Sequence, residues 1–207
     1  MTRATFTIAL AFVCSTAAAA PLVTYDSPCE CRDTHGKHRW AEKNDSDPPP
    51  TDASAIQAVI PSDMFNWQGP TEFLKASSER IPAEQKWYAL TGRVIDLRAE
   101  EDGDLHIALT DASGDKPGAV AVVVEIPAKP EWCKLRTIVF GWTQVRFPFR
   151  VRSGRKLKLS QPLIVRVIGK AFFDIGHAPA DHGNRRTDLP GYAAWEIHPV
   201  MALQVVQ

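Results

Sequence analysis

The segments LIVRVIGKAFFD (163–174) and WEIHPVMALQVV (195–206) decide the fold. Both are rich in β-branched and aromatic residues, and both have the length and apolar character of strands in a small β-domain. A polar loop, residues 175–194, joins them. We expect the two segments to pair as neighbouring strands, and the upstream chain to supply the rest of a small barrel around them.

Three further strands are expected upstream of this pair. Residues Trp87–Leu97 alternate with many β-forming side chains, and Asp102-Gly103-Asp104 is the signal of a hairpin turn. Leu105–Thr110 alternates cleanly, so that its odd-numbered residues are expected to face the core. Ala119–Ile126 is apolar on both faces, as a covered strand should be.

One helix is expected between the third and fourth strands. Residues Trp132–Phe147 carry apolar side chains at helical spacing, and Pro148 ends that pattern. The resulting order β-β-β-α-β-β predicts a mainly β protein, a five-stranded OB-fold-like Greek-key barrel over residues 86–207. A split β-sandwich is the alternative that the same periodicity allows.

Residues 21–85 are expected to form an irregular, proline-rich N-terminal extension. Short helices are predicted at residues 52–59, 61–67 and 71–78, the first of them capped by Asp52 or Ser54. Four large apolar residues lie in this region, and they are too apolar for a free linker: Met64, Phe65, Trp67 and Phe73. We expect these side chains to pack on the barrel.

The first twenty residues have the pattern of an export signal. Arg3 precedes the short apolar run Phe6–Val13, and Ala18-Ala19-Ala20 provides a small-residue cleavage site. Spanning a membrane takes about 20 apolar residues, and no later segment is that long and apolar. The chain is therefore expected to be exported, either to the periplasm or into the medium.

The cysteines of the mature chain predict a disulfide. An oxidising compartment favours pairing, and the isolated Cys133 is expected to pair with Cys29 or Cys31. The spacing Cys29-x-Cys31-x3-His35-x2-His38 offers zinc-type ligands as an alternative, but it is tighter than the usual zinc motifs.

Three acid–histidine pairs are the candidate functional residues. They are Asp104-x-His106, Asp174-x-x-His177 and Glu196-x-His198. Residues at i and i+2 of a strand share a face, so the acid and imidazole of the first and third pairs can share a ligand. A divalent metal, Zn²⁺ or Mn²⁺, is the cofactor that such side chains would hold. The alternative is a set of carboxylate–histidine hydrogen bonds that fix the long loop before Trp195.

A basic segment is the second candidate binding region. Its cationic residues alternate with Phe147 and Phe149, and the four expected to contact a ligand are Arg146, Arg150, Arg152 and Lys156. Basic groups mixed with aromatic rings suit a polyanion or a single strand of nucleic acid. A solvated hairpin around Ser153-Gly154 explains the same composition without any ligand.

Several stretches, spread over most of the mature chain, resemble a group of exported bacterial proteins of uncharacterised function. They are Glu30-Cys31-Arg32-Asp33, His35-Gly36, Arg39-Trp40, Pro61-Ser62-Asp63-Met64, Asp102-Gly103-Asp104-Leu105-His106, Glu131-Trp132-Cys133, the run 169–177 and Trp195-Glu196-Ile197-His198-Pro199-Val200. The resemblance implies export, and it implies no particular activity.

A second, fragmentary resemblance concerns the turn Asp102-Gly103-Asp104. It is similar to the metal-binding turn of thermonucleases, which are OB-folds. Those enzymes continue with an arginine in a leucine-rich strand followed by Asp-x-Pro-Glu, whereas residues 105–130 contain no arginine.

Taken together, the sequence predicts an exported OB-fold binding or interaction domain. The formal net charge is zero, which argues against bulk electrostatic capture of nucleic acid. The sequence leaves the ligand of this domain open, and the candidate classes are a polyanion and a component of the cell envelope. The alternative is a metal-dependent hydrolase, resembling phosphodiesterases or nucleases, that uses the acid–histidine residues. A structural component of the envelope is the third interpretation.

Overall fold

The computed structural model describes residues 22–30, 38–100, 102–113, 119–152 and 155–206. Five strands close into a barrel: β3 (Trp87–Ala99), β4 (Leu105–Thr110), β5 (Val122–Ile126), β8 (Ile164–Phe173) and β9 (Trp195–Val205). Their order around the barrel is β3-β4-β5-β9-β8, and β8 pairs back onto β3. Strands β5 and β9 are parallel and the other neighbours antiparallel. This is the OB-fold Greek key, so the predicted fold class is confirmed.

Strand β3 closes the barrel because it is long enough to pair twice. Its first half, Trp87–Arg93, pairs with β8, and its second half, Arg93–Ala99, pairs with β4. Gly92 lies where the strand passes from one partner to the other. A Cβ atom there would lie 2.7 Å from the carbonyl oxygen of Thr110, so only glycine allows this close approach of the two strands.

The register between β8 and β9 shifts near Pro199, which cannot donate to the ladder. Gly169 is paired with Val200, whereas Ala171 is paired with Ile197, so β9 carries extra residues at this point. The irregularity lies directly after His198, at the end of the stretch that carries the candidate site.

The core fills the barrel with side chains from alternate strand positions. In β4, residues Leu105, Ile107 and Leu109 are fully buried inside it, as predicted, and Val124 and Ile197 meet them from β5 and β9. The intervening residues of these strands face outward. This alternation places the polar residues of β4, β5 and β9 on one outer face of the barrel.

The helix between β5 and β8 is shorter than the sequence predicted. The turn η3 (Pro130–Trp132) leads into α3 (Cys133–Gly141). The amides of Trp142 and Thr143 bond to carbonyls three residues earlier, which ends the helix before Val145. The indole Nε1 of Trp132 donates to the carbonyl of Val200, 2.8 Å away, and attaches the helical segment to β9.

The first described residues form an arm beside α3. Strand β1 (Leu22–Tyr25) pairs with β6 (Phe149–Arg152), and the buried Tyr25 ring stacks on Phe149 with 5.2 Å between centroids. A disulfide joins Cys29 to Cys133 of α3. Of the two partners expected for Cys133, Cys29 is therefore the observed one. Residues 1–20, Cys31 and His35 lie outside the described part of the chain.

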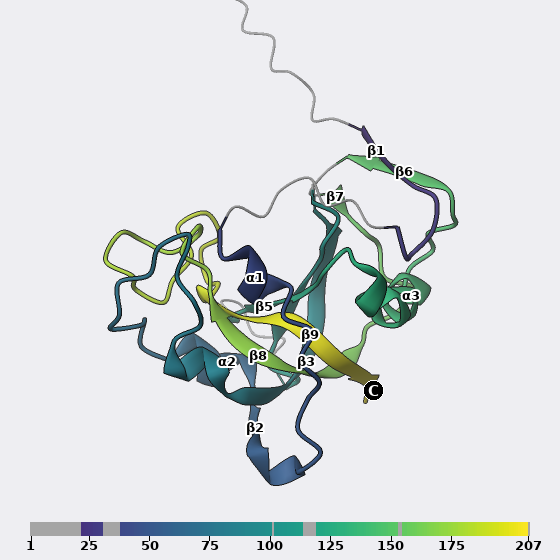
Figure 1. Ribbon diagram of the computed structural model, residues 1–207. Coiled ribbons are helices and arrows are strands. Elements are labelled where there is room, and N and C mark those ends of the chain that lie inside the picture. Colours follow the sequence, from purple (N-terminus) through teal and green to yellow (C-terminus); the bar gives the residue numbers. More distant parts are fainter. Residues whose placement is uncertain (1–21, 31–37, 101, 114–118, 153–154, 207) are drawn as a thin grey trace, which may run out of the picture.

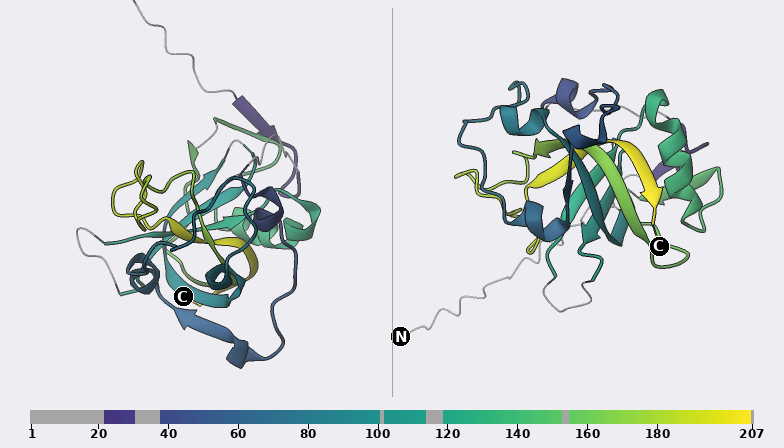
Figure 2. Two further views of the ribbon diagram at one scale, coloured as in Figure 1. Left: turned by 60° about the vertical axis from the view of Figure 1, so that its left-hand side comes forward. Right: turned by 90° about the horizontal axis from the view of Figure 1, so that it is seen from below.

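Residues 38–86 pack along the barrel as short elements: α1 (Trp40–Lys43), η1 (Ala53–Ala55), β2 (Ile56–Val59), α2 (Pro61–Phe65) and η2 (Pro82–Gln85). Figure 2 shows them around the strands. β7 (Arg155–Lys156) is a further short strand beside β3.

The expected helix at 52–59 is wrong beyond its first turn. Asp52 does cap that turn, but β2 then extends β3 as a parallel edge strand. Residues 71–78 form turns instead of the expected helix. Met64 is buried and Trp67 packs on Tyr88 and Trp195, whereas Phe73 is 74% exposed and does not pack on the barrel as predicted. No helix in the described ranges has the length and apolar character needed to cross a membrane.

Candidate functional site

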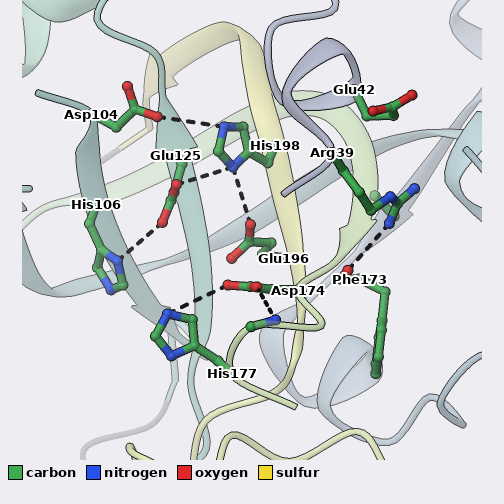
Figure 3. Close-up of polar contacts among 12 residues, drawn as sticks. Arg39, Glu42, Asp104, His106, Glu125, Phe173, Asp174, His177, Glu196 and His198 are labelled. Carbon is green, nitrogen blue, oxygen red and sulfur yellow. Dashed lines mark hydrogen bonds and ion pairs between the residues drawn. The ribbon is translucent and has the colours of Figure 1, made fainter. Parts of the chain in front are cut away.

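The candidate site lies on the outer face of β4, β5 and β9. Four outward-facing side chains meet there: His106 of β4, Glu125 of β5, and Glu196 and His198 of β9 (Figure 3). His106 and Glu125 are directly opposite each other in the antiparallel pair, and the parallel pairing of β5 with β9 brings Glu125 beside His198. Cross-strand neighbours on one face approach closely enough to interact.

His198 is the centre of this arrangement. Its Nδ1 atom lies 3.1 Å from Glu125 Oε2 and 3.1 Å from Glu196 Oε1, and its Nε2 atom lies 3.8 Å from Asp104 Oδ2. The side chain is completely buried, and burial alone would lower its pKa. The charge of Glu125 and the hydrogen bonds to Glu125 and Glu196 outweigh burial and raise the pKa to about 9.

The pKa values of Asp104 and Glu125, two of the carboxylates around His198, are shifted in opposite directions. Burial raises the pKa of Asp104 to about 7, and the charge of Asp102 adds to that effect. Burial would also raise the pKa of Glu125, but the charge of His198 and hydrogen bonds from His106 and His198 hold it well below its usual value. Asp104 is fixed by a hydrogen bond from the Ala128 amide to its Oδ1 atom at 2.8 Å.

Arg186 links this cluster to the loop before β9. Its Nη2 atom lies 2.6 Å from Glu196 Oε2 and 3.5 Å from Asp174 Oδ2, and the guanidinium is almost fully buried. His177 completes the chain of contacts, because its Nε2 atom is 3.7 Å from Asp174 Oδ2 and its Nδ1 atom is 3.0 Å from Asp188 Oδ2.

We call the connected set the acid–histidine network. Its members are Asp104, His106, Glu125, Asp174, His177, Arg186, Glu196 and His198.

Helix α1 crosses the same face of the barrel (Figure 1). Its Lys43 Nζ lies 5.4 Å from the centroid of the Phe172 ring. Burial would lower the pKa of Lys43, but the charges of Glu125, Glu196, Asp174 and Asp104 raise it. The residue before α1, Arg39, forms a fully buried ion pair with Glu84 and also lies over the Phe172 ring, with its Cζ 4.6 Å from the centroid.

A cavity of about 370 Å³ opens beside the network. The β3–β4 turn and the β8–β9 loop form its two sides, which is where OB-folds commonly bind their ligands. Its lining residues are mostly charged: Lys43, Arg98, Glu100, Asp102, His106, Glu125, Asp174, His177, Arg186, Asp188 and Leu189. Five carboxylates thus face three basic side chains, and we refer to this space as the acidic cavity.

All six residues expected from the acid–histidine pairs belong to the network. Of these, His106, Asp174 and His177 line the acidic cavity, whereas Asp104, Glu196 and His198 lie behind it. His106 and His198 do not contact each other directly, because Glu125 of the intervening strand contacts both.

Glu125, Arg186 and Lys43 were missed by the sequence analysis. Glu125 had a recognisable signal: it is the one charged residue in the apolar run Ala119–Ile126. A charge in a covered strand is expected to have a partner. Arg186 and Lys43 had no such signal, because Arg186 lies in the loop before β9 and Lys43 in a four-residue helix, and neither segment has a periodic pattern.

Three members of the network could ligate a metal. Asp104, Glu125 and His198 each offer a ligand atom, and these atoms lie within 4.8 Å of one another. Their donor set of one imidazole and two carboxylates suits Zn²⁺ or Mn²⁺.

The basic segment lies apart from this site. Arg146 and Arg150 are exposed, and Lys156 Nζ is 3.2 Å from Asp96 Oδ1, so part of its charge is already paired. The side chain of Arg152 lies outside the described part of the structure. None of the described members of this segment lines the acidic cavity.

The chain matches no protein-family model and no curated protein. Among solved structures, it is similar to asparaginyl-tRNA synthetase from Entamoeba histolytica in complex with asparaginyl-adenylate. The TM-score is 0.36 and the identity 10%, over 73% of this chain and 23% of that one, so the chain spans about a quarter of that protein's length. The OB assignment made above depends on the strand order of this chain alone.

Proposed function

We propose that this chain is an OB-fold binding domain that takes a cationic ligand in the acidic cavity. The observation that carries the proposal is the excess of carboxylates on the face that OB-folds use for binding. A cavity lined predominantly by one sign of charge attracts ligands of the other sign.

The charges of the cavity walls are only partly neutralised within the protein. Arg98 is paired with Asp96 and Arg186 with Glu196, so two of the three basic lining residues already have carboxylate partners outside the lining. Glu100 and Asp188 have partly exposed side chains, and among the described residues their ion-pair contacts are with histidines: Glu100 lies 3.8 Å from His106 and Asp188 lies 3.0 Å from His177. These two carboxylates are the ones best placed to meet an incoming cation.

The same charges argue against an anionic ligand in this cavity. A phosphate or sulfate group would approach five carboxylates, and like charges repel. A polyanion would have to bind on the basic segment, where Lys156 is already paired with Asp96.

We further propose that the domain works outside the cytoplasm. The disulfide between Cys29 and Cys133 supports this, because disulfides persist mainly in oxidising compartments. The export signal expected in residues 1–20 is consistent with the same location.

Calorimetric titration tests the binding proposal, with spermidine, arginine amide and Zn²⁺ as cationic probes and heparin as an anionic one. We expect saturable binding of at least one cation, weakened by added salt, as for other partly exposed charges. The double variant Glu100→Gln/Asp188→Asn should bind roughly tenfold more weakly, since each exposed charge contact contributes up to about 1 kcal/mol.

The matched control removes the same charge elsewhere. Glu72→Gln/Glu131→Gln changes two exposed carboxylates that do not line the cavity, so its affinity should equal that of the parent. Equal weakening in both double variants, or no heat and no melting shift with any cation, would show that the acidic cavity is not a cation site.

A further inference from the structure

We infer that the cation taken by this site is a divalent transition metal, held by Asp104, Glu125 and His198. The inference rests on the proposed function, because it names the chemistry of the ligand for the same face of the barrel. Of the three proposed ligands, Glu125 lines the acidic cavity, whereas Asp104 and His198 lie behind it.

The first argument is the Nε2 atom of His198. Within the described residues it is buried and has no hydrogen-bond partner. The carboxylate oxygen Oδ2 of Asp104 is 3.8 Å away, which is too long for a hydrogen bond. A metal ion lies about 2.0–2.2 Å from imidazole nitrogen and carboxylate oxygen, so one ion can bridge these two atoms.

The second argument is the support behind the histidine. A histidine that ligates a metal through one ring nitrogen usually donates its other N–H to a carboxylate, which fixes the ring and its tautomer. His198 Nδ1 lies 3.1 Å from Glu196 Oε1 and equally 3.1 Å from Glu125 Oε2. Glu196 is held in turn by Arg186 at 2.6 Å, so it is the carboxylate that keeps the Nδ1 hydrogen bond when Glu125 turns an oxygen to the metal. Asp104 is oriented as well, because its Oδ1 atom accepts a hydrogen bond from Ala128 and leaves Oδ2 toward His198.

The third argument is charge. Four carboxylates of the network, those of Asp104, Glu125, Asp174 and Glu196, act on the permanent cation Lys43, and all of them except Asp104 also act on the permanent cation Arg186. A metal-bound histidine is neutral, so two negative charges would remain for the metal to balance. A dication matches this count better than a monovalent amine does.

The set of ligands also narrows the choice of metal ion. One imidazole with two carboxylates suits Zn²⁺ or Mn²⁺, whereas Ca²⁺ prefers oxygen ligands alone. Three protein ligands leave a fourth position of a tetrahedral site open. Glu125 borders the acidic cavity, so a second molecule could reach that position from the cavity, as a metal-dependent hydrolase would require.

The test is metal binding by the full chain. After chelator treatment, dialysis against Zn²⁺ or Mn²⁺ and metal analysis should give one bound equivalent, with a raised melting temperature. Asp104→Asn keeps the oxygen that accepts from Ala128 but weakens the metal ligand, so affinity should fall at least about tenfold. Asp52→Asn is the matched control: it makes the same change at an exposed aspartate that also accepts a backbone hydrogen bond and does not line the cavity, so affinity should change by less than about threefold.

A second measurement needs no variant that alters the site. Nitrogen-15 spectra of the histidine rings of the parent protein should show Zn²⁺ moving the Nε2 signal of one buried histidine. The exposed ring of His177, assigned with His177→Gln, should not move. Zn²⁺ bound without any change at a buried histidine would overturn the inference, as would equal affinity in Asp104→Asn.

These outcomes separate the inference from the proposed function. Saturable spermidine binding without any metal uptake, or metal uptake that Asp104→Asn leaves intact, rejects the metal site but leaves the proposal that the acidic cavity binds a cation. Failure of every cation to bind rejects both.

Discussion

His198 is a single residue on which most of the site's electrostatics converge. Carboxylates face both of its ring nitrogens: Glu125 and Glu196 on one side, Asp104 on the other. An isolated charge at this depth would be costly, and the surrounding carboxylates are what make a buried imidazolium stable. In the metal-free protein, a proton on the imidazole of His198 therefore takes the place of the inferred metal.

This predicts that metal-free protein loses stability above neutral pH. Because the folded-state pKa of His198 is raised, its contribution is fully present below the unfolded pKa of about 6.5 and is lost as the pH rises through about 9. The shift corresponds to on the order of 3 kcal/mol. Part of this contribution is already lost below pH 7.5, so urea unfolding with chelator between pH 7.5 and 9.5 should show a decline of roughly 2 kcal/mol in the parent and a much flatter response in His198→Gln.

The exposed His177 provides the control for that measurement. His177→Gln should keep the parent's pH dependence over the same window. Asp104, whose pKa is raised to about 7, also loses its contribution with rising pH, but mostly below the window chosen. A parent protein equally stable at pH 7.5 and 9.5 would contradict the assignment of a buried imidazolium.

At the residue scale, the sequence pointed to the six acids and histidines that the network contains, because acid–histidine pairs two or three residues apart are a local pattern. It did not identify Glu125 as their common partner. That role depends on the parallel pairing of β5 with β9, which joins residues far apart in the chain. Lys43 and Arg186 could not be predicted for the same reason, since their contacts depend on how α1 and the β8–β9 loop fold over the barrel.

At the element scale, strand patterns were more informative than helix patterns. The five barrel strands were predicted close to their observed bounds, because alternation and turn residues mark them locally. The helix expected to end at Pro148 already ends at Gly141, and residues 56–59 form a strand where a helix was expected. In both segments, contacts with the barrel outweighed weak local helix preference.

The bulge of β9 predicts a strong requirement for glycine at position 169. A Cβ atom there would lie 2.4 Å from the carbonyl oxygen of Pro199 and 2.5 Å from Ile197 Cγ2. Gly169→Ala should therefore lower the free energy of unfolding by about 1–3 kcal/mol, since overpacking forces the backbone to move.

Gly141 is the matched comparison, because nothing lies within 4 Å of a Cβ atom built at this last residue of α3. Gly141→Ala should leave stability unchanged or raise it by up to about 1 kcal/mol, as alanine is the better helix former. Chemical denaturation of both variants measures the contrast. Equal effects of the two substitutions would argue against a close approach of β8 and β9 at the bulge.

At the scale of the whole molecule, the barrel is enclosed by chain segments that precede it. Residues 38–47 complete the candidate site and are held by the Arg39–Glu84 ion pair and by Lys170, whose Nζ is 2.6 Å from Asp45 Oδ2. The sequence predicted that the extension would pack on the barrel, but it did not predict which face. Such long-range ion pairs leave no periodic pattern in the sequence.

The arm formed by β1 and residues 26–30 gives the last prediction. Cys29 and Cys133 are separated by 104 residues in the sequence. The bond between them lowers the conformational entropy of the unfolded chain. The chain-entropy model gives about 4–5 kcal/mol for a loop of this size, so Cys29→Ser/Cys133→Ser should lose a stability of that order. Native packing should survive, because Tyr25 remains stacked on Phe149 and its hydroxyl donates to the carbonyl of Glu100 at 3.3 Å. Denaturation of the parent after reduction should coincide with that of the double variant, while Cys31→Ser should match the oxidised parent. A loss of stability in Cys31→Ser as large as in the double variant would mean that Cys31, and not Cys29, forms the stabilising bond.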